Sequence, residues 1–415
     1  MASTHLKIDR DQSARRIEQD VETLGGPEYT RSAETICRYA YTPEYRRTLD
    51  YFKAAFEDLA YDVSEDPVGN FVARNRPDEE PVFGIGSHCD SNRNGGKYDG
   101  TLGVVTALEI CRLNAEHGLD LPLQVISFLE EESSGFGVAL LGSRIAAQRI
   151  TEEELEVANA IDDGRPFFEH AREAGYAPER WRESVVILRN LTGWIELHIE
   201  QARVLQDTGN RIGVVTAIAG ITWLDITFEG RADHAGATPM DFRIDASVPA
   251  AEAVVELERL VLEAGNGAVG TAGAFAVDPG LHNVVPGEAR VGMDIRAPRD
   301  DLVDQVVSGV TDFVQSVAKG RGVSVDISSR FRMPATPMDA GIVAALERAA
   351  AKAGEPFMSM PSGAAHDTMC VADHVGTAMV FVPCTDGISH APEESAEPAD
   401  AAVAAEVILN AIREL

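Results

Sequence analysis

The stretch Gly84-Ile-Gly-Ser-His-Cys-Asp-Ser-Asn-Arg-Asn-Gly-Gly-Lys-Tyr-Asp-Gly-Thr-Leu-Gly103 decides the fold and the chemistry that we expect of this chain. An apolar run at residues 82–85 predicts a buried strand that becomes polar at His88 and Asp90. A glycine-rich loop then leads through Asp99 into a predicted helix. An imidazole and two carboxylates near a strand end are typical of a metal site in an α/β protein. The alternative is a solvated strand-to-helix loop that contains His and Asp by chance.

The length and charge of the chain limit the classes of protein to which it can belong. A chain of 415 residues is longer than one hydrophobic core usually supports, so we expect two domains. Its 36 Lys and Arg residues against 67 Asp and Glu residues give a formal charge of −31. A nucleic-acid partner is not expected, because binding to phosphates requires a basic surface. The acidic excess would suit a high-salt environment but does not establish one.

The cysteines and the apolar segments indicate a cytoplasmic protein. The five cysteines are scattered and form no CxxC pair, which is typical of reduced thiols rather than of a disulfide framework or a structural zinc site. Residues 1–10 contain no apolar segment of a secretory signal. No run of ~18 uninterrupted apolar residues occurs, so we expect neither a membrane span nor a membrane partner.

The order of apolar segments predicts a domain inserted into an α/β domain. Short strands at 70–73, 82–86 and 123–129 alternate with helices, which favours a mostly parallel sheet with helices on both faces. From residue 214 the order becomes βαββαβ, typical of a ferredoxin-like unit. Its predicted segments are strand 214–229, helix 245–264, strands 268–276 and 288–296, helix 300–319 and strand 323–332. We therefore expect a discontinuous catalytic domain (1–213 and 331–415) and an inserted lid or dimerisation domain (214–330).

Three consecutive acids, Glu130, Glu131 and Glu132, follow the predicted strand 123–129. Adjacent carboxylates repel one another, and a bound cation relieves that repulsion most directly. Because side chains alternate in direction along an extended segment, one acid could bind metal while the next faces a substrate. The alternative is the acidic first turn of a helix, where carboxylates interact favourably with the helix dipole.

Other polar residues near predicted strand ends have both a functional and a structural interpretation. They are His198, His234, Asn283, Arg296 and His390. His198 lies among apolar residues, where a hydrogen-bonded core histidine is common, whereas His390 lies in a loop, where a functional role is more common. Asn283 could instead form a turn, and Arg296 could form a surface ion pair. The sequence contains neither a G-x-x-x-x-G-K-[ST] phosphate loop nor a G-x-S-x-G nucleophile elbow.

Several short motifs between residues 84 and 400 occur in an order that is specific as a set. They are Gly86-Ser-His-Cys-Asp, Asn94-Gly-Gly-Lys-Tyr-Asp-Gly, Glu130-Glu-Glu, Gly142-Ser-Arg, Glu196-Leu-His-Ile-Glu-Gln, Asp233-His-Ala-Gly-Ala-Thr-Pro-Met, Ser362-Gly-Ala-Ala-His-Asp and Asp386-Gly-Ile-Ser-His. This set resembles the dinuclear-metal M20-type amidohydrolases, in the branch of N-carbamoyl-L-amino-acid hydrolases and allantoate amidohydrolases. The inserted βαββαβ domain is also what this family would have.

The resemblance implies two divalent metal ions per subunit, Zn²⁺ or Mn²⁺, with Co²⁺ and Ni²⁺ as alternatives. The implied ligands are His88, Asp99 and His198 for one ion, and Asp99, Glu132 and His390 for the other. Asp90 would orient His88 from behind. Glu131 would act as the general base on a water shared by the two ions.

The resemblance also implies how a small carboxylate-bearing substrate would be held. His234 would stabilise the tetrahedral oxyanion, in the active site of the partner subunit, which implies a homodimer formed through the inserted domain. Arg296 would bind the substrate carboxylate. The other residues implied in substrate binding are Gln201, Asn283, Gly363 and Ala364.

The function we expect is hydrolysis of the carbamoyl C–N bond of a substrate such as an N-carbamoyl-L-amino acid. Allantoate or N-carbamoyl-β-alanine hydrolysis is the alternative within this branch, followed by an N-acyl-amino-acid deacylase or dipeptidase and then a non-catalytic binding protein. The implied metal ligand His198 is a histidine at a position where the dipeptidases of this scaffold would have an acid. Departures from the expected motifs, at Cys89, Ser133 to Gly135, Ala202-Arg203 and Ala365, remove no ligand but leave the substrate open.

Overall fold

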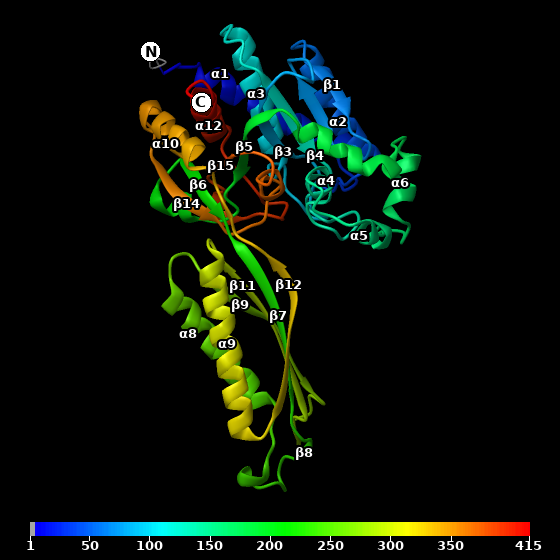
Figure 1. The fold of residues 1–415 in the computed structure, drawn as a ribbon, viewed down its shortest axis with the longest axis vertical. Helices are drawn as coiled ribbons and strands as arrows, with labels where there is room; N and C mark the ends of the chain where they lie inside the picture. Colours follow the sequence, from blue (N-terminus) through cyan, green and yellow to red (C-terminus); the bar gives the residue numbers. More distant parts are fainter. Residues whose placement is uncertain (1–4) are drawn as a thin grey trace. The chain divides into compact units, whose positions relative to one another are not determined.

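The strand predicted before the glycine-rich loop is β3 (Val82–His88), which lies inside a nine-stranded sheet in the computed structural model (Figure 1). The structure describes residues 5–415, so residues 1–4 of the predicted catalytic domain lie outside the described residues. The described chain divides into two units: residues up to 216, 338–360 and 366–415 form the first, and residues 217–337 and 361–365 form the second.

The centre of the first unit's sheet is parallel. Four strands form this centre, in the order β4 (Leu123–Phe128), β3, β5 (Leu191–Ile199) and β15 (Thr377–Val382), and each strand pairs in parallel with the next. Antiparallel pairs flank this centre: β1 (Asp62–Glu65) and β2 (Phe71–Arg74) lie beside β4, and β6 (Ile212–Ile218) lies beyond β15. β13 (Thr336–Pro337) belongs to the second unit and pairs with residues 217 and 218 at the end of β6. β14 (Phe357–Ser362) pairs with β6. The predicted α/β fold is confirmed, with parallel strands at the centre of the sheet and antiparallel pairs at its edges.

Helices cover the sheet because its strands are apolar on both faces. One layer contains α1 (Arg10–Leu24), α3 (Thr101–Glu116) and α12 (Pro398–Ile412), which contact one another, and it packs on β3, β5 and β15. Ile195 and Leu197 of β5 belong to the core under this layer. Trp194 and Glu196 alternate with them and hydrogen-bond Thr368 of α11 (Thr368–Val371), on the other face.

The remaining helices of the first unit lie around this sheet. α2 (Pro43–Glu57) begins after an N-cap, where the Thr42 hydroxyl accepts a hydrogen bond from the Tyr45 N–H. α10 (Ala340–Ala353) contacts α12 and β15. The shorter helices are α4 (Leu141–Ala146), α5 (Glu152–Val157), α6 (Phe167–Glu173), α7 (Val204–Thr208) and the 3₁₀ segment Pro178–Leu188. Among residues 5–415, every helix is too short or too polar to cross a lipid bilayer.

The second unit has the predicted βαββαβ order. Its elements are β7 (Gly220–Glu229), α8 (Ser247–Ala264), β9 (Val269–Asp278), β11 (Glu288–Ala297), α9 (Asp300–Arg321) and β12 (Ser324–Met333), and a small hairpin contains β8 (Asp233–His234) and β10 (Val284–Val285). The sheet is antiparallel in the order β12-β7-β11-β9. The single strand predicted at 214–229 was wrong, because the chain passes from β6 to β7 at Ala219.

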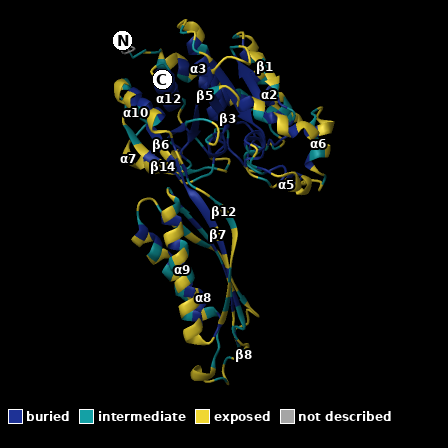
Figure 2. Cartoon of the chain, viewed as in Figure 1, coloured by how far each residue is buried: buried dark blue, intermediate teal, exposed yellow. Residues whose placement is uncertain are grey.

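Burial separates the two units into a large and a smaller core (Figure 2). The strands β3 and β5 of the first unit are buried along almost their whole length. In the second unit α8 and α9 bury one face against the sheet and expose the other, which follows their amphipathic sequences. The role of this unit as a lid or dimerisation domain stays a prediction.

Candidate metal centre

The residues predicted as metal ligands follow the parallel centre of the sheet. His88 is the last residue of β3, and His198 lies one residue before the end of the parallel strand β5. Acids 130–132 follow β4, and His390 lies in the loop after β15. Because parallel strands end at one edge of a sheet, these segments meet there although they are distant in sequence. Asp99 reaches the same edge from the loop before α3.

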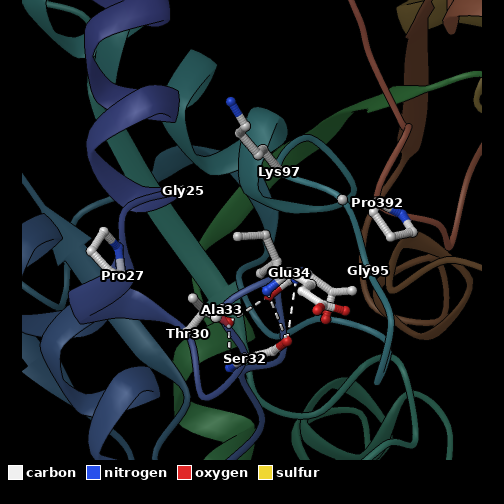
Figure 3. Close-up of a pocket in the computed structure, with 12 residues that line it drawn as sticks. Gly25, Pro27, Thr30, Ser32, Ala33, Glu34, Gly95, Lys97 and Pro392 are labelled. Carbon is white, nitrogen blue, oxygen red and sulfur yellow. Dashed lines mark hydrogen bonds between the residues drawn. The ribbon is translucent and has the colours of Figure 1, made fainter.

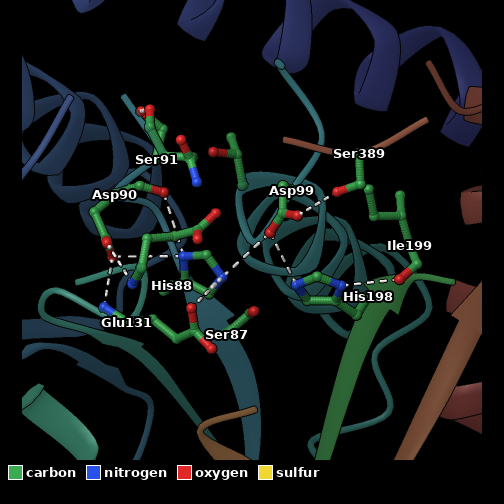
Figure 4. Close-up of polar contacts among 12 residues, drawn as sticks. Ser87, His88, Asp90, Ser91, Asp99, Glu131, His198, Ile199 and Ser389 are labelled. Carbon is green, nitrogen blue, oxygen red and sulfur yellow. Dashed lines mark hydrogen bonds and ion pairs between the residues drawn. The ribbon is translucent and has the colours of Figure 1, made fainter. Parts of the chain in front are cut away.

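Five predicted ligands form two groups that share Asp99. His88, Asp99 and His198 form one group, and Asp99, Glu132 and His390 form the other. Asp99 Oδ1 lies 3.2 Å from His198 Nε2 and 3.5 Å from His88 Nε2 (Figure 4). Its other oxygen, Oδ2, lies 3.4 Å from His390 Nε2. His390 Nε2 lies 3.4 Å from Glu132 Oε1, so the carboxylate of Asp99 stands between two sets of donors.

The two buried imidazoles are oriented by their Nδ1 atoms. His88 Nδ1 lies 3.2 Å from the backbone oxygen of Asp90 and 3.4 Å from its Oδ1. His198 Nδ1 lies 2.9 Å from the backbone oxygen of Ile199 (Figure 4). A proton on each Nδ1 leaves Nε2 as a lone-pair donor toward Asp99, which is the usual arrangement behind a histidine ligand.

The donor atoms of this centre fit divalent cations. Within residues 5–415, His88 Nε2 and Glu132 Oε1 are buried atoms without a hydrogen-bond partner. Burial and then the charge of Asp99 raise the pKa of Glu132 to about 7, and burial raises the pKa of Glu131 well above its ordinary range. Buried lone pairs and crowded carboxylates are unfavourable unless a cation compensates them. The residues present are therefore suited to hold two metal ions.

Asp90 also holds the acidic loop in place. Its Oδ1 accepts a hydrogen bond from the Glu131 N–H, and its Oδ2 accepts one from the Glu132 N–H, each at 3.1 Å. The predicted extended geometry of this loop was wrong, because Glu130 has a φ of 55°. This residue, in the left-handed region, turns the chain. The turn, rather than the predicted alternation of side chains along an extended segment, brings Glu131 and Glu132 to the centre.

Glu130 points away from the metal ligands and has a structural role. Its carboxylate accepts hydrogen bonds from the N–H groups of Gly135, Ala40 and Phe136, the last two at 3.1 Å. Burial, followed by repulsion from Asp90, raises the pKa of Glu130 to about 8. The alternative interpretation of the acids as a helix start is also wrong, since no helix begins at residues 130–132.

Arg38 is a residue of this centre that we did not identify from the sequence. It is 1% exposed, and its Nε donates to the Cys89 oxygen at 2.8 Å. Its Nη2 donates to Thr101 Oγ1 at 2.9 Å, so it joins the strand end that carries His88 to the helix start after Asp99. Nothing in the sequence distinguishes Arg38 from a surface arginine, because its partners are mainly backbone oxygens distant in sequence.

Two departures from the expected motifs have a clear structural context. The Cys89 side chain is fully buried in the first unit's core, so its exchange for an aliphatic residue is a change in packing. Gln201, predicted to help bind substrate, donates to Asp99 Oδ2 at 2.8 Å, and its substrate-binding role stays a prediction. Its neighbours Ala202 and Arg203 are exposed at the surface.

The remaining predicted site residues lie in the second unit. They are His234, Asn283, Arg296, Gly363 and Ala364. His234 is exposed, and the N–H of the next residue, Ala235, donates to the Asn283 oxygen at 2.9 Å. Arg296 forms a bidentate ion pair with Asp294, at 2.8 Å from both Nε and Nη2, and its Nη1 donates to the Gly363 oxygen at 2.9 Å. The alternative interpretation of Arg296 as an ion pair is thus also observed.

Comparisons with known proteins identify the family of this chain. A family model described as Peptidase family M20/M25/M40 matches residues 78–414. The chain is similar to an N-carbamoyl-L-amino-acid amidohydrolase of Paenarthrobacter aurescens, with 36% identity over 97% of this chain and 98% of that protein. It is similar to a ureidoglycolate hydrolase of Oryza sativa subsp. japonica, with 33% identity over 100% of this chain and 86% of that protein. A crystal structure of a hydantoinase/carbamoylase family amidase from Burkholderia multivorans has a TM-score of 0.86 and 31% identity, covering 99% of this chain and 98% of that one.

Proposed function

This chain belongs to peptidase family M20/M25/M40, and from that membership we propose that it is a metal-dependent amidohydrolase. The reaction is hydrolysis of a carbamoyl C–N bond in a small carboxylate-bearing substrate such as an N-carbamoyl-L-amino acid. The observation that carries this proposal is the pair of donor groups sharing Asp99, with the carboxylate of Glu131 beside them. Relatives named as N-carbamoyl-L-amino-acid amidohydrolases and ureidoglycolate hydrolases support the substrate class.

The donor groups would hold two divalent ions. His88, Asp99 and His198 would hold one, and Asp99, Glu132 and His390 the other. Such ions supply Lewis-acid chemistry, lowering the pKa of water and polarising the substrate carbonyl. His-rich and carboxylate donors suit Zn²⁺ or Mn²⁺, and Co²⁺ and Ni²⁺ are the alternatives.

Glu131 acts as the general base in this proposal. Its Oε2 lies 3.8 Å from His88 Nε2, and its backbone is held by the carboxylate of Asp90. It takes a proton from the attacking water and gives it to the leaving nitrogen when the C–N bond breaks, a contribution of ~10²–10⁴ in rate. The largely buried position of Glu131 keeps bulk water away from this transfer.

The residues of the second unit would bind and polarise the substrate. His234 Nδ1 accepts hydrogen bonds from the N–H groups of Gly236 at 3.1 Å and Ala237 at 3.2 Å. Its proton therefore lies on Nε2, where it can be donated to an oxyanion. Asp294 occupies Nε and one hydrogen of Nη2 of Arg296, and the Gly363 oxygen occupies one hydrogen of Nη1. One N–H on each terminal nitrogen therefore remains for a substrate carboxylate.

The second unit also offers a surface for a homodimer. Val248, Val255 and Leu262 recur every seventh residue along α8 and are 37%, 67% and 75% exposed. Beside α8, β9 is one of the two edge strands of the order β12-β7-β11-β9. Exposed apolar helix surface next to a strand edge supports pairing with a second copy through this unit. All five cysteines are free thiols, which supports a cytoplasmic location.

A substrate panel tests the proposed function. Ammonia release is measured with N-carbamoyl-L-amino acids, N-carbamoyl-β-alanine, allantoate and ureidoglycolate, and amine release with N-acyl amino acids and dipeptides. We expect hydrolysis of carbamoyl substrates, about two divalent ions per chain by metal analysis, and loss of turnover with retained metal in Glu131→Gln. Full activity of the metal-free protein would refute the mechanism. Cleavage of the dipeptides alone would instead assign the peptidase alternative.

A further inference from the structure

Glu394 lies in the loop after His390 and is only 5% exposed. Its Oε1 accepts hydrogen bonds from two consecutive backbone N–H groups, that of Tyr98 at 2.9 Å and that of Asp99 at 3.0 Å. Asp99 is the residue shared by both donor groups. A side chain from the His390 loop therefore fixes the backbone of the shared ligand, about three hundred residues earlier in the sequence.

Ser389 strengthens this connection from the same loop. Its hydroxyl lies 2.9 Å from Asp99 Oδ2 and 3.3 Å from Glu394 Oε2 (Figure 4). A hydroxyl has one hydrogen to donate, and the shorter distance favours its donation to Asp99. The backbone of Asp99 is thus held by Glu394 and its carboxylate by Ser389, while His390 follows Ser389 directly.

Gly96 shows how closely the two loops fit. A Cβ atom at Gly96 would overlap the Cβ, Cδ and Oε1 atoms of Glu394. The φ of Gly96 lies outside the left-handed region, so its backbone would accept alanine if Glu394 were absent. Gly96 also lines a cavity of about 200 Å³ whose wall includes Gly95, Lys97 and Pro392 (Figure 3). The Glu394 side chain thus occupies the space that a side chain at residue 96 would need.

We propose that Glu394 is a positioning residue of the metal centre. It sets the position of Asp99 so that one carboxylate can serve both donor groups, and it couples that position to the loop of His390. The inference rests on the proposed function, because it assumes that these groups hold metal ions. Glu394 itself belongs to neither donor group, since its Oε1 is occupied by two backbone donors. Loss of such outer partners typically weakens metal affinity ~10–100-fold.

Four variants test this role: Glu394→Ala, Glu394→Gln, Gly96→Ala and, as the matched control, Glu393→Gln at the exposed neighbouring glutamate. The dissociation constants of Zn²⁺ and Mn²⁺ are measured by chelator competition, together with the melting temperature of the metal-free protein. We expect ~10–100-fold weaker metal binding in Glu394→Ala and Gly96→Ala. Glu394→Gln should bind within a few-fold of wild type, because its amide oxygen still accepts the two N–H groups.

The outcomes separate a positioning role from a structural one. A lower melting temperature with unchanged metal affinity in Glu394→Ala would overturn the proposal, and so would equal losses in Glu394→Ala and Glu393→Gln. If Glu394→Ala does not fold, Gly96→Ala and Ser389→Ala carry the same test on the opposite loop and on the second contact. Because the readout is metal affinity, it stands even if the wild-type protein hydrolyses none of the carbamoyl substrates. That result would refute the proposed function alone.

Discussion

Glu132→Gln is the perturbation that most directly tests the crowding of carboxylates in the metal centre. Glu132 is a predicted ligand with a side chain 6% exposed, and its Oε1 has no hydrogen-bond partner among the described residues. The backbone N–H of residue 132 still donates to Asp90 in the variant. The substitution therefore removes a buried negative charge without removing a hydrogen bond of the acidic loop.

The expected effect follows from the pKa of Glu132. Burial and the charge of Asp99 raise it to about 7 from an ordinary value of 4.5. At ~1.4 kcal/mol for each pH unit between these values, ionised Glu132 destabilises the metal-free fold by up to ~3 kcal/mol. Below pH 4.5 the carboxyl is protonated in both states and contributes nothing. The penalty grows as the pH rises through this window and is complete above pH 7.

Chemical denaturation of the chelator-treated protein measures this difference. We expect Glu132→Gln to be more stable than wild type by ~3 kcal/mol at pH 8 but by less than ~1 kcal/mol at pH 5. Added divalent metal should reverse the order, because the variant lacks a charged ligand and gains less free energy from binding. Glu156→Gln, at an exposed position, serves as the control. A metal-free Glu132→Gln protein that is less stable than wild type at pH 8 would refute the reasoning.

Three further changes test other parts of the structure. Arg296→Lys should raise KM for a carboxylate substrate ~10–100-fold with little change in kcat, because it loses a bidentate charged hydrogen bond; a change in kcat alone would place the carboxylate elsewhere. Arg38→Leu should lower the free energy of unfolding by ~3 kcal/mol, because buried oxygens of Cys89 and Thr101 lose their donor. Urea denaturation of the metal-loaded protein measures this loss, and an unchanged free energy of unfolding would contradict the stabilising role of Arg38. Leu262→Glu should convert a dimer to monomers in analytical ultracentrifugation, since it places a charge on the exposed stripe of α8; an unchanged mass would move the interface to another surface.

The sequence alone was sufficient for the architecture and for the chemical type of the site. The strand predicted at 82–86 and the helix predicted at 300–319 lie close to the positions that the structure shows, because local hydrophobic patterning determines them. Motif order was enough to select the residues that form the two donor groups, since residue types such as His, Asp and Glu restrict the chemistry. The β6–β7 break and the left-handed turn at Glu130 were not predictable, because packing rather than local preference produces them.

Only the tertiary structure decided how the ligands are held. Arg38, Ser389 and Glu394 carry no sequence signal of their own, because each acts through hydrogen bonds to segments distant in the chain. The sequence determined that Asp99 would be a carboxylate in a glycine-rich loop, and that the loop would end at a helix. The parallel strands, which end at a common edge of the sheet, bring His88, His198 and His390 close to Asp99. The sheet, rather than any local motif, sets the distances between these side chains.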